Sequence, residues 1–320
     1  MNYSARRILL TLFVYLAAAL GVSAGGAGEK VKAPKPQGAS EAAVQYPLTV
    51  TDDSGATVVI PRKPQRIISL TLFTDDVLLE IVEPGRILGV TSFSADPAIS
   101  NIVAKAAPIP NKLTTNIEMI LSLEPDLVFV ANWTEADKVR QLRDAGVPVY
   151  LTASALSVPA IQEKIRAVAR VVGEPLKGEA VVSAMNERLA AIGEKLASLP
   201  AGKSLTVMDY ATWGASMGKG SSWDEIVRLA GLKNAVGELT SDEWGQVPIS
   251  KEKLIELDPD ILVLPGWVYE DPKAADAFFR QITEDPALQG LKAVRARRVI
   301  RLPENLKSST SQYIVDAVES

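Results

Sequence analysis

Aromatic and polar side chains stand directly after the apolar runs that predict strands, where residues of an α/β sheet contact ligands. In the first half of the chain these residues are Thr71, Phe73, Phe93, Lys112 and Trp133. In the second half they are Tyr210, Trp213, Lys219, Trp244, Trp267 and Tyr269. Four of the five tryptophans belong to this set, although the chain is only 6% aromatic. Aromatic rings offer broad apolar contact at low entropic cost, so the set predicts a site for a large planar or chelated ligand.

Catalysis is the weaker interpretation of these residues. The sequence contains no histidine and no cysteine, which removes the commonest general base, the commonest metal ligand and every thiolate site. No pair of carboxylates stands at strand ends that a cleft would bring together. We therefore predict a protein that is not an enzyme and holds no cofactor or metal of its own. The formal net charge of −4 gives no basic footprint for nucleic acid.

The chain contains an internal repeat, in which residues 116–133 align without gaps with residues 250–267. Each copy predicts a short helix, an acidic-Pro-Asp turn and an apolar strand that ends near a tryptophan. The alignment superposes Glu118 on Glu252, Leu123 on Leu257, Asp126 on Asp260 and Trp133 on Trp267. A chain that builds this unit twice is predicted to form two similar lobes with a cleft between them. The alternative for Trp213 or Trp267 is that it fills the interior of a lobe.

Apolar runs rich in Val, Ile and Leu recur along the chain and alternate with helical patterns such as 74–82 and 135–145. The runs are 66–70, 86–90, 126–130, 147–151, 204–210, 260–264 and 298–302. Runs without polar alternation are typical of parallel strands that are buried on both faces. We therefore predict an α/β fold of two lobes, each with a parallel-rich sheet flanked by helices. A β-hairpin around Asp53-Ser-Gly55 is expected to lead into the first lobe.

A long helix is predicted over residues 174–200, where Pro175 suits the first turn. Apolar residues then follow at alternating steps of three and four: Val182, Met185, Leu189, Ile192, Leu196 and Leu199. A helix from 174 to 199 would span about 39 Å at 1.5 Å per residue, which is enough to join the lobes. The alternative is a surface helix of one lobe. We expect the lobes to cover residues 46–173 and 201–320.

The N-terminal residues have the pattern of a secretory signal peptide. Two arginines precede a short apolar run, and a Val-Ser-Ala cleavage site ends at Ala24. We predict a signal peptide over residues 1–24 and a disordered leader over residues 25–45. Because the chain has no cysteine to carry a lipid, we expect a soluble periplasmic protein that is exported through the inner membrane and is not lipid-anchored.

Several short motifs distributed from Tyr46 to Ser320 point together to one known family. They are Thr51-Asp-Asp-Ser-Gly55, Pro64-Gln-Arg-Ile-Ile-Ser-Leu70, Arg86-Ile-Leu-Gly-Val-Thr91, the segment 116–126, Gln141-Leu-Arg-Asp-Ala-Gly146, Asp224-Glu-Ile-Val-Arg-Leu-Ala-Gly231 and Asp285-Pro-Ala-Leu288. With them the chain resembles the substrate-binding proteins of ABC importers for iron-siderophore complexes, haem and cobalamin. The resemblance implies two α/β lobes joined by a single long helix, and a permease dimer with a cytoplasmic ATPase as partner. We expect a monomer. The sequence stops within the helix predicted over residues 311–320, where members of the family usually run a little further.

In that family one exposed glutamate on each lobe docks onto arginines of the membrane permease. The matching positions are Glu118 and Glu252, the pair that the repeat superposes. Arginine binds carboxylate bidentately, and surface ion pairs are worth only about 0–1 kcal/mol each, which suits reversible docking. The alternative role for each glutamate is to stabilise the first turn of a helix through the helix dipole.

The resemblance leaves the ligand open. A ferric siderophore ranks first, because such chelates are usually anionic and are met by residues such as Lys112, Lys219, Tyr210 and Tyr269. Phe93 matches an aromatic position of cobalamin binders, although Lys112 occupies another, so cobalamin or a related corrinoid is the alternative. Residues 70–75 lack the axial tyrosine that haem binders of the family commonly offer, which disfavours haem. A sensory module that presents its ligand to a receptor is the alternative from a different class.

Overall fold

The computed structural model describes residues 44–200, 202, 204–268, 271 and 273–320. The predicted signal peptide, most of the predicted leader and Tyr269 lie outside these residues. Within the described ranges, no helix is long and apolar enough to cross a lipid bilayer. The predicted β-hairpin is present: β1 (Leu48–Thr51) pairs antiparallel with β2 (Thr57–Ile60). The Asp52 carboxylate closes the turn between them by accepting the backbone N–H of Ala56 (3.0 Å).

The first sheet has five parallel strands in the order β5-β4-β3-β6-β7. Their bounds are β3 (Ile67–Ser69), β4 (Ile87–Thr91), β5 (Asn111–Leu113), β6 (Leu127–Ala131) and β7 (Val149–Thr152). The chain builds outward from β3 through β4 to β5, and then returns to the other side of β3 with β6 and β7. Such a reversal of strand order opens a crevice at the carboxyl ends of the strands, where α/β sheets bind ligands.

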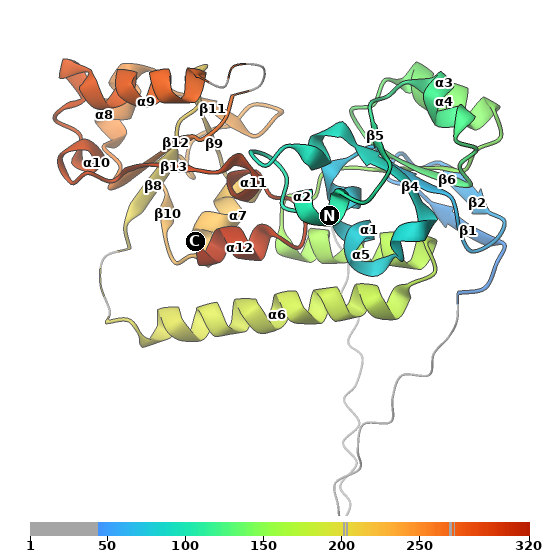
Figure 1. Ribbon diagram of the computed structural model, residues 1–320. Helices are drawn as coiled ribbons and strands as arrows, with labels where there is room; N and C mark the ends of the chain where they lie inside the picture. The colour runs from blue at the N-terminus through green and yellow to red at the C-terminus, as the bar shows by residue number, and fades with distance from the viewer. Residues whose placement is uncertain (1–43, 201, 203, 269–270, 272) are drawn as a thin grey trace, which may run out of the picture. The chain divides into compact units, whose positions relative to one another are not determined.

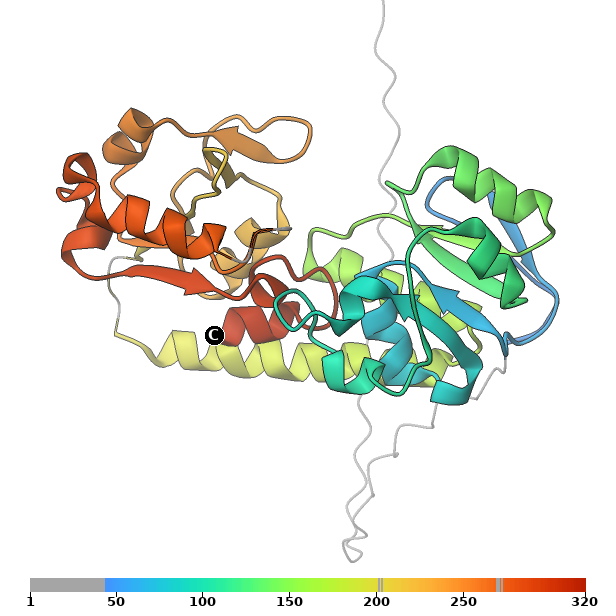
Figure 2. The ribbon, with the colours of Figure 1, turned by 45° about the horizontal axis from the view of Figure 1, so that its top comes forward.

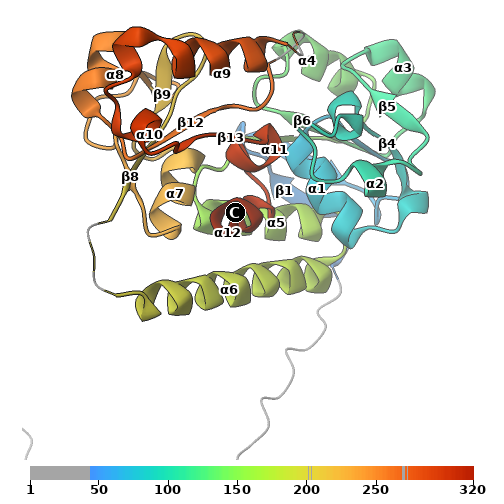
Figure 3. The same cartoon turned by 60° about the vertical axis from the view of Figure 1, so that its left-hand side comes forward.

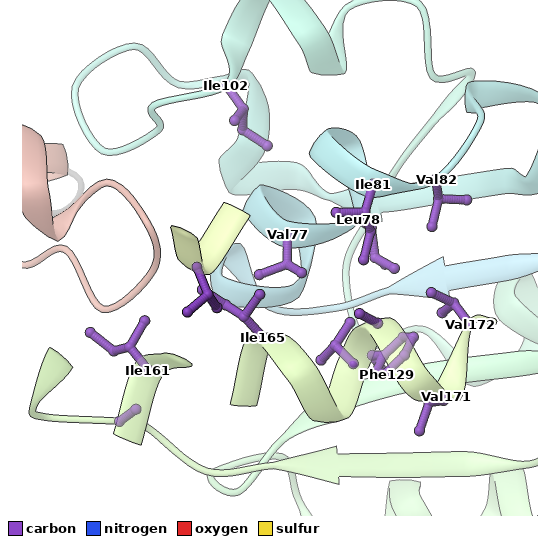
Figure 4. Packing of buried hydrophobic residues seen from close by; sticks show 14 of the residues in the cluster. Val77, Leu78, Ile81, Val82, Ile102, Phe129, Ile161, Ile165, Val171 and Val172 are labelled. Atoms are coloured by element: carbon purple, nitrogen blue, oxygen red, sulfur yellow. The ribbon is translucent and has the colours of Figure 1, made fainter. Parts of the chain in front are cut away.

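Helices cover both faces of this sheet, as expected for strands that are buried on both sides. Figure 1 shows α1 (Leu72–Ile81) and α5 (Val158–Val171) on one side, with α3 (Ile117–Ser122) and α4 (Ala136–Asp144) on the other. Alternate residues of β6 point to opposite faces, and Figure 4 shows Phe129 of β6 among side chains of α1 and α5. Val128 belongs instead to the cluster formed with α3 and α4. The short helices η1 (Pro84–Arg86), η2 (Ser92–Ala95) and α2 (Val103–Ala106) complete the lobe.

A single helix of 24 residues, α6 (Pro175–Ser198), lies between the lobes. It confirms the long helix that the sequence predicts, and Figure 3 shows it as one continuous helix. Its apolar stripe is buried at Val182 and Met185 but ends at Leu199, which is 62% exposed. Near the second lobe, Leu196 approaches Gly231. The lobe boundaries at residues 173 and 201 remain a prediction.

The second sheet has four parallel strands in the order β10-β8-β12-β13. Their bounds are β8 (Thr206–Asp209), β10 (Lys233–Asn234), β12 (Ile261–Pro265) and β13 (Val299–Leu302). Strands β9 (Ala215–Met217) and β11 (Gln246–Pro248) form a separate antiparallel pair. One face of the four-stranded sheet packs on α8 (Lys251–Leu257), α9 (Ala274–Glu284) and α10 (Lys292–Arg295), and the other on α7 (Ser222–Leu229). Figure 2 shows the two sheets as separate bodies with their own helices.

The C-terminal part of the chain returns to the first lobe. After β13 come α11 (Glu304–Lys307) and α12 (Ile314–Glu319), while η3 (Pro286–Leu288) precedes α10. Ile314 and Val315 of α12 belong to the same buried cluster as Ile165 of α5, and Ile226 of α7 joins them. A continuous apolar core therefore links the lobes on the side of α6.

The internal repeat is present in the backbone as well as in the sequence. Glu124 and Asp258, the acidic residues before the prolines, both have left-handed φ angles, 47° and 42°. The aspartates that follow the prolines then accept hydrogen bonds from backbone N–H groups at the start of equivalent strands. Asp126 accepts the backbone N–H of Arg66 before β3 (2.8 Å), and Asp260 accepts that of Thr206 in β8 (2.9 Å). The two copies thus build the same turn in each lobe.

Candidate functional site

The strand ends of both sheets meet at a cavity of about 410 Å³, which we call the main cavity. Its wall takes residues that follow β3, β4, β6 and β7 of the first sheet and residues that follow β12 and β13 of the second. The volume lies in the range of about 300–1,000 Å³ that is usual for small-molecule sites. Five of the predicted site residues line the main cavity: Thr71, Phe73, Phe93, Trp133 and Trp267.

Four of these five residues are aromatic. Trp133 and Trp267 occupy equivalent positions of the repeat, after β6 and β12, so each lobe contributes one tryptophan to the wall. Trp133 is 69% exposed and Phe93 is 43% exposed. Large aromatic side chains exposed in the wall of a cavity are typical of ligand sites. Trp267 is partly exposed and Trp213 is 68% exposed, so neither fills the interior of a lobe.

The polar part of the wall consists mainly of hydroxyl and amide side chains. Asp76 and Glu304 are its ionisable groups, and none of the described lining residues is lysine or arginine. A wall of this composition favours a ligand with hydrogen-bonding groups and without net negative charge, because the described wall offers two acids and no cation to compensate a buried anion.

Asp76 of α1 is the more buried of the two acids, at 5% exposure. Its Oδ2 accepts a hydrogen bond from Ser311 Oγ (2.6 Å), and its backbone carbonyl accepts one from Gln312 Nε2 (2.8 Å). Its Oδ1 is buried and has no partner among the described residues. Burial raises the pKa of Asp76 to about 7, against the opposing effects of the Ser311 hydrogen bond and the Lys105 charge.

The neighbouring acid, Asp75, holds the fold together beside the main cavity. Its carboxylate accepts the backbone N–H of Thr91 at the end of β4 (3.1 Å). Asp75 is completely buried, and burial raises its pKa well above the usual value. Since Thr91 itself lines the cavity, Asp75 positions part of the wall without entering it.

A second pocket of about 210 Å³ adjoins the main cavity and shares Glu304 and Ser308 with it. The predicted residue Trp213 lines this side pocket. Asp209, at the end of β8, is buried in its wall, and burial raises the pKa of this carboxyl. Lys307 supplies a cation here, with Nζ 3.9 Å from Asp209 Oδ2 and 3.6 Å from Glu304 Oε1.

Two predicted site residues are engaged inside a lobe. Lys112 of β5 donates from Nζ to the backbone carbonyls of Ala106 (2.8 Å) and Ile109 (2.6 Å). Tyr210 follows β8 and packs on Phe278, with 5.8 Å between the ring centroids. Neither residue is in the described wall of the main cavity or the side pocket.

Two further predicted residues lie on exposed loops of the second lobe. Lys219 is exposed between β9 and α7. Trp244 is 74% exposed, just before β11. Neither belongs to the described walls of the two pockets. The predicted residue Tyr269 lies outside the described residues.

The main cavity also contains residues that the sequence analysis did not name. Thr152 ends β7 and is followed by Ala153 and Ser154, while Glu304 and Asn305 follow β13. The strand-end rule that selects Trp133 would have selected them too. Residues 308–310 and Asp76 carry no such signal, because their place in the wall depends on the return of the chain to the first lobe.

Glu118 and Glu252 are the second residues of α3 and α8, and both are exposed. Equivalent N-caps begin the two helices: Asn116 accepts the backbone N–H of Met119 (3.0 Å), and Ser250 accepts that of Lys253 (3.1 Å). The backbone N–H of Glu252 and the Ser250 hydroxyl hold the pKa of Glu252 below its usual value. The two carboxylates therefore occupy matching first-turn positions, where the helix dipole favours negative charge.

Two α/β lobes joined by one long helix, with a cavity where the strand ends of both meet, define a ligand-capturing binding protein. The family model described as "Periplasmic binding protein" matches residues 67–306. This match covers most of the chain, and the chain therefore belongs to the periplasmic binding protein family.

Individual relatives agree with this membership. The chain is 24% identical over 280 residues to the "Uncharacterized ABC transporter substrate-binding lipoprotein YvrC" of Bacillus subtilis, covering 86% of this chain and 84% of that protein. It is 24% identical over 252 residues to the "Cobalamin-binding protein" of Halobacterium salinarum, covering 78% and 67%. The solved structure of the molybdate-binding protein MolA of Haemophilus influenzae, bound to molybdate, superposes with a TM-score of 0.69 at 20% identity, covering 85% and 89%.

These findings confirm the predicted fold and the predicted class. The structural similarity supports two α/β lobes with a single long helix between them. The chain is a substrate-binding protein of an ABC transporter and not an enzyme. This class implies a permease and an ATPase as partners, and a small molecule as ligand.

Proposed function

We propose that this protein captures an uncharged or cationic metal chelate in the main cavity and delivers it to the permease of an ABC importer. The observation that carries the proposal is the composition of the wall. Phe73, Phe93, Trp133 and Trp267 supply apolar contact, and the described wall contains two acids and no basic side chain. Aromatic faces suit a large ligand, and the hydroxyl and amide groups between them suit its polar edge.

The charge of the wall changes the ranking of ligands that the sequence predicts. An anionic ferric siderophore, haem with its carboxylates, or molybdate would meet Asp76 and Glu304 without a lysine or arginine from the described wall. Such an anion would leave its charge uncompensated. We therefore place an uncharged or cationic ferric hydroxamate first. A corrinoid is second, which is consistent with the name of the Halobacterium relative.

Quenching of tryptophan fluorescence tests the proposal, because Trp133 and Trp267 both lie in the wall. The probes are ferrichrome (an uncharged ferric hydroxamate), cyanocobalamin, ferric citrate and haem. Saturable quenching by ferrichrome, reduced in Trp133→Phe and Trp267→Phe, is expected. Trp244→Phe is the matched control, since Trp244 is outside the described walls. Binding of cyanocobalamin alone would favour the corrinoid, and binding of ferric citrate or haem alone would overturn the charge assignment.

We also propose that Glu118 and Glu252 dock the protein onto its permease. The support for this role is their equivalence: both are exposed, and both are the second residue of a helix that begins each copy of the repeat. A pair of carboxylates on equivalent surfaces of two lobes complements paired arginines on a dimeric partner.

A periplasmic location after cleavage at Ala24 is the accompanying proposal for where the protein works. Its support is the family and the signal-peptide pattern of residues 1–24. The Bacillus relative is named a lipoprotein, so the form of the mature N-terminus has to be measured. Mass spectrometry of the protein recovered from a periplasmic fraction should give an unmodified chain that begins at Gly25.

A further inference from the structure

The carboxylate of Asp76, in the wall of the main cavity, has one oxygen for which the described residues provide no hydrogen-bond donor. Asp76 is 5% exposed and uses Oδ2 for the Ser311 hydroxyl, but Oδ1 has no hydrogen-bond partner among the described residues. A buried carboxylate oxygen without a partner costs free energy when the group is ionised. A fold that keeps such a group beside a ligand cavity leaves one interaction for the ligand to supply.

Further buried oxygens around Asp76 lack a partner within the described structure. Asn305 Oδ1 and Ser309 Oγ, both from residues of the same wall, have no hydrogen-bond partner among the described residues, and neither has Gln312 Oε1 beside Asp76. Carboxylate and amide oxygens accept hydrogen bonds but do not donate them. A group that satisfies Asp76 Oδ1, Asn305 Oδ1 and Gln312 Oε1 must therefore bring N–H or O–H donors of its own, whereas the Ser309 hydroxyl can donate or accept.

The nearby charges do not already compensate Asp76. Lys105 of α2 is the cation whose charge lowers the pKa of Asp76. Its ammonium, however, pairs with Glu80 and donates to Tyr313 Oη (3.4 Å). Asp75, the neighbouring titratable group on α1, is itself an acid and supplies no positive charge. Glu304, the second acid of the wall, lies 3.6 Å from Lys307 Nζ. Among the described residues, Asp76 is thus the acid of the wall that has no ion pair.

We propose that the Asp76 carboxylate selects for a positively charged, N–H-donating group on the ligand, which it stabilises at the part of the wall formed by α1 and residues 308–310. This inference rests on the proposed capture of a metal chelate and adds the charge of one of its groups. A ligand ammonium placed there gains the attraction of a buried carboxylate in a medium of low dielectric constant. The hydroxyl and amide oxygens around it accept its remaining protons.

The test compares two ferric chelates that differ in one charge. Ferrioxamine B carries a pendant ammonium, and its N-acetylated form has the same iron-hydroxamate core without that charge. The full-length protein should bind ferrioxamine B about 10-fold to 100-fold more tightly, which is the range for one hydrogen bond to a charged group. In Asp76→Asn this preference should disappear, while affinity for the acetylated chelate stays within about 3-fold. Glu187→Gln, which neutralises one exposed acid of α6 outside the described walls of both pockets, is the matched control and should keep the preference.

A pH series provides a second readout that a purely structural role of Asp76 would not produce. The ammonium of ferrioxamine B keeps its charge between pH 5 and 8, so a loss of affinity toward pH 5 reports protonation of the protein. We expect this loss in the wild type but not in Asp76→Asn, and not for the acetylated chelate. Equal affinity of the wild type for both chelates would overturn the inference and leave chelate capture standing. Binding of neither chelate would overturn the inference and the first-ranked ferric hydroxamate, whereas capture of a corrinoid is decided separately by the cyanocobalamin titration.

Discussion

Asn101 and Asn305 hydrogen-bond to each other from opposite halves of the chain. Asn101 Nδ2 donates to the backbone carbonyl of Asn305 (3.0 Å), and Asn305 Nδ2 donates to Asn101 Oδ1 (2.9 Å). The backbone N–H of Asn305 also donates to the carbonyl of Ala98 (3.3 Å). Both asparagines line the main cavity. The loop after η2 and helix α11 are therefore joined at the wall of the ligand site.

The bond between the two side chains should appear as a coupling energy. Asn101→Ala removes both side-chain contacts, whereas Asn305→Ala removes only the bond to Asn101 Oδ1. A double-mutant cycle on the free energy of unfolding should give a coupling of about 1 kcal/mol, the usual net contribution of a hydrogen bond. Urea titrations of the four proteins measure it. Additive effects of the two substitutions would show that this contact does not stabilise the folded protein.

Reversal of charge at the repeat glutamates should stop transport without affecting ligand binding. In Glu118→Arg/Glu252→Arg both exposed carboxylates become cations, which would repel the arginines that we propose on the permease. Uptake of labelled chelate by cells should fall to background, because like charges at a docking surface cost several kcal/mol. Affinity measured by fluorescence should be unchanged, since neither glutamate belongs to the described cavity wall.

A matched pair of acids on α6 controls for the change in net charge. Glu187 and Glu194 are exposed, and none of the ion pairs in the described structure includes them. Glu187→Arg/Glu194→Arg changes the net charge by the same amount as the docking variant. It should transport normally. If both double variants lost transport equally, general electrostatics and not local docking would explain the result.

Buried carboxyls should make the protein more stable near pH 5 than near pH 8. Burial raises the pKa of Asp76 to about 7, and it also raises the pKa values of Asp75 and Asp209, whereas unfolded aspartates titrate near 3.9. The folded state then binds more protons than the unfolded state between these values. The free energy of unfolding therefore falls as the pH rises from about 4 to about 7, by about 1.4 kcal/mol for each unit of pKa difference.

Chemical denaturation across this pH range measures the effect, and Asp76→Asn identifies the share of one group. The variant should show a flatter dependence of unfolding free energy on pH, because its amide does not titrate. Asp242→Asn, which replaces an aspartate on an exposed turn, is the control and should keep the wild-type slope. A wild-type stability that rises steadily from pH 5 to 8 would contradict the assignment.

The long apolar runs of the sequence predict the framework of the fold. Each of the seven runs is a strand of one of the two parallel sheets, from β3 at Ile67 to β13 at Leu302. The strands that were not predicted are β5, β9, β10 and β11, which have two or three residues each. Such short strands carry too few residues for a pattern, and they form because the neighbouring strand offers free backbone groups. Helix α1 begins at Leu72, two residues before the predicted start.

The site is predictable where one strand end determines it and unpredictable where two distant segments meet. Trp133 and Trp267 follow strands directly, so sequence reasoning finds them. Lys112 lies within β5, a strand that the apolar runs do not predict, and its ammonium donates to two backbone carbonyls nearby. Asp76 lies inside a helix, and its place in the wall follows from contact with Ser311, far along the chain. No local pattern reports such a contact.

The close packing of α5 against α6 gives a prediction about the stability of the protein. Gly178 of α6 lies so near Ala169 of α5 that a Cβ built on the glycine would overlap the Ala169 methyl group. Gly193, farther along the same helix, has nothing within 4 Å of such a Cβ. The two glycines therefore offer the same substitution in one helix, once in a close contact and once in open space.

Replacement by alanine should have opposite effects at these two positions. Gly193→Ala should stabilise the protein by about 0.5–1 kcal/mol, because alanine loses less backbone entropy than glycine in a helix. Gly178→Ala gains the same entropy but must push α5 and α6 apart, and overpacking of this kind costs about 1–3 kcal/mol. Thermal unfolding of both variants measures the difference. If Gly178→Ala were as stable as Gly193→Ala, the two helices would not be in the close contact that we infer fixes α6 on the first lobe.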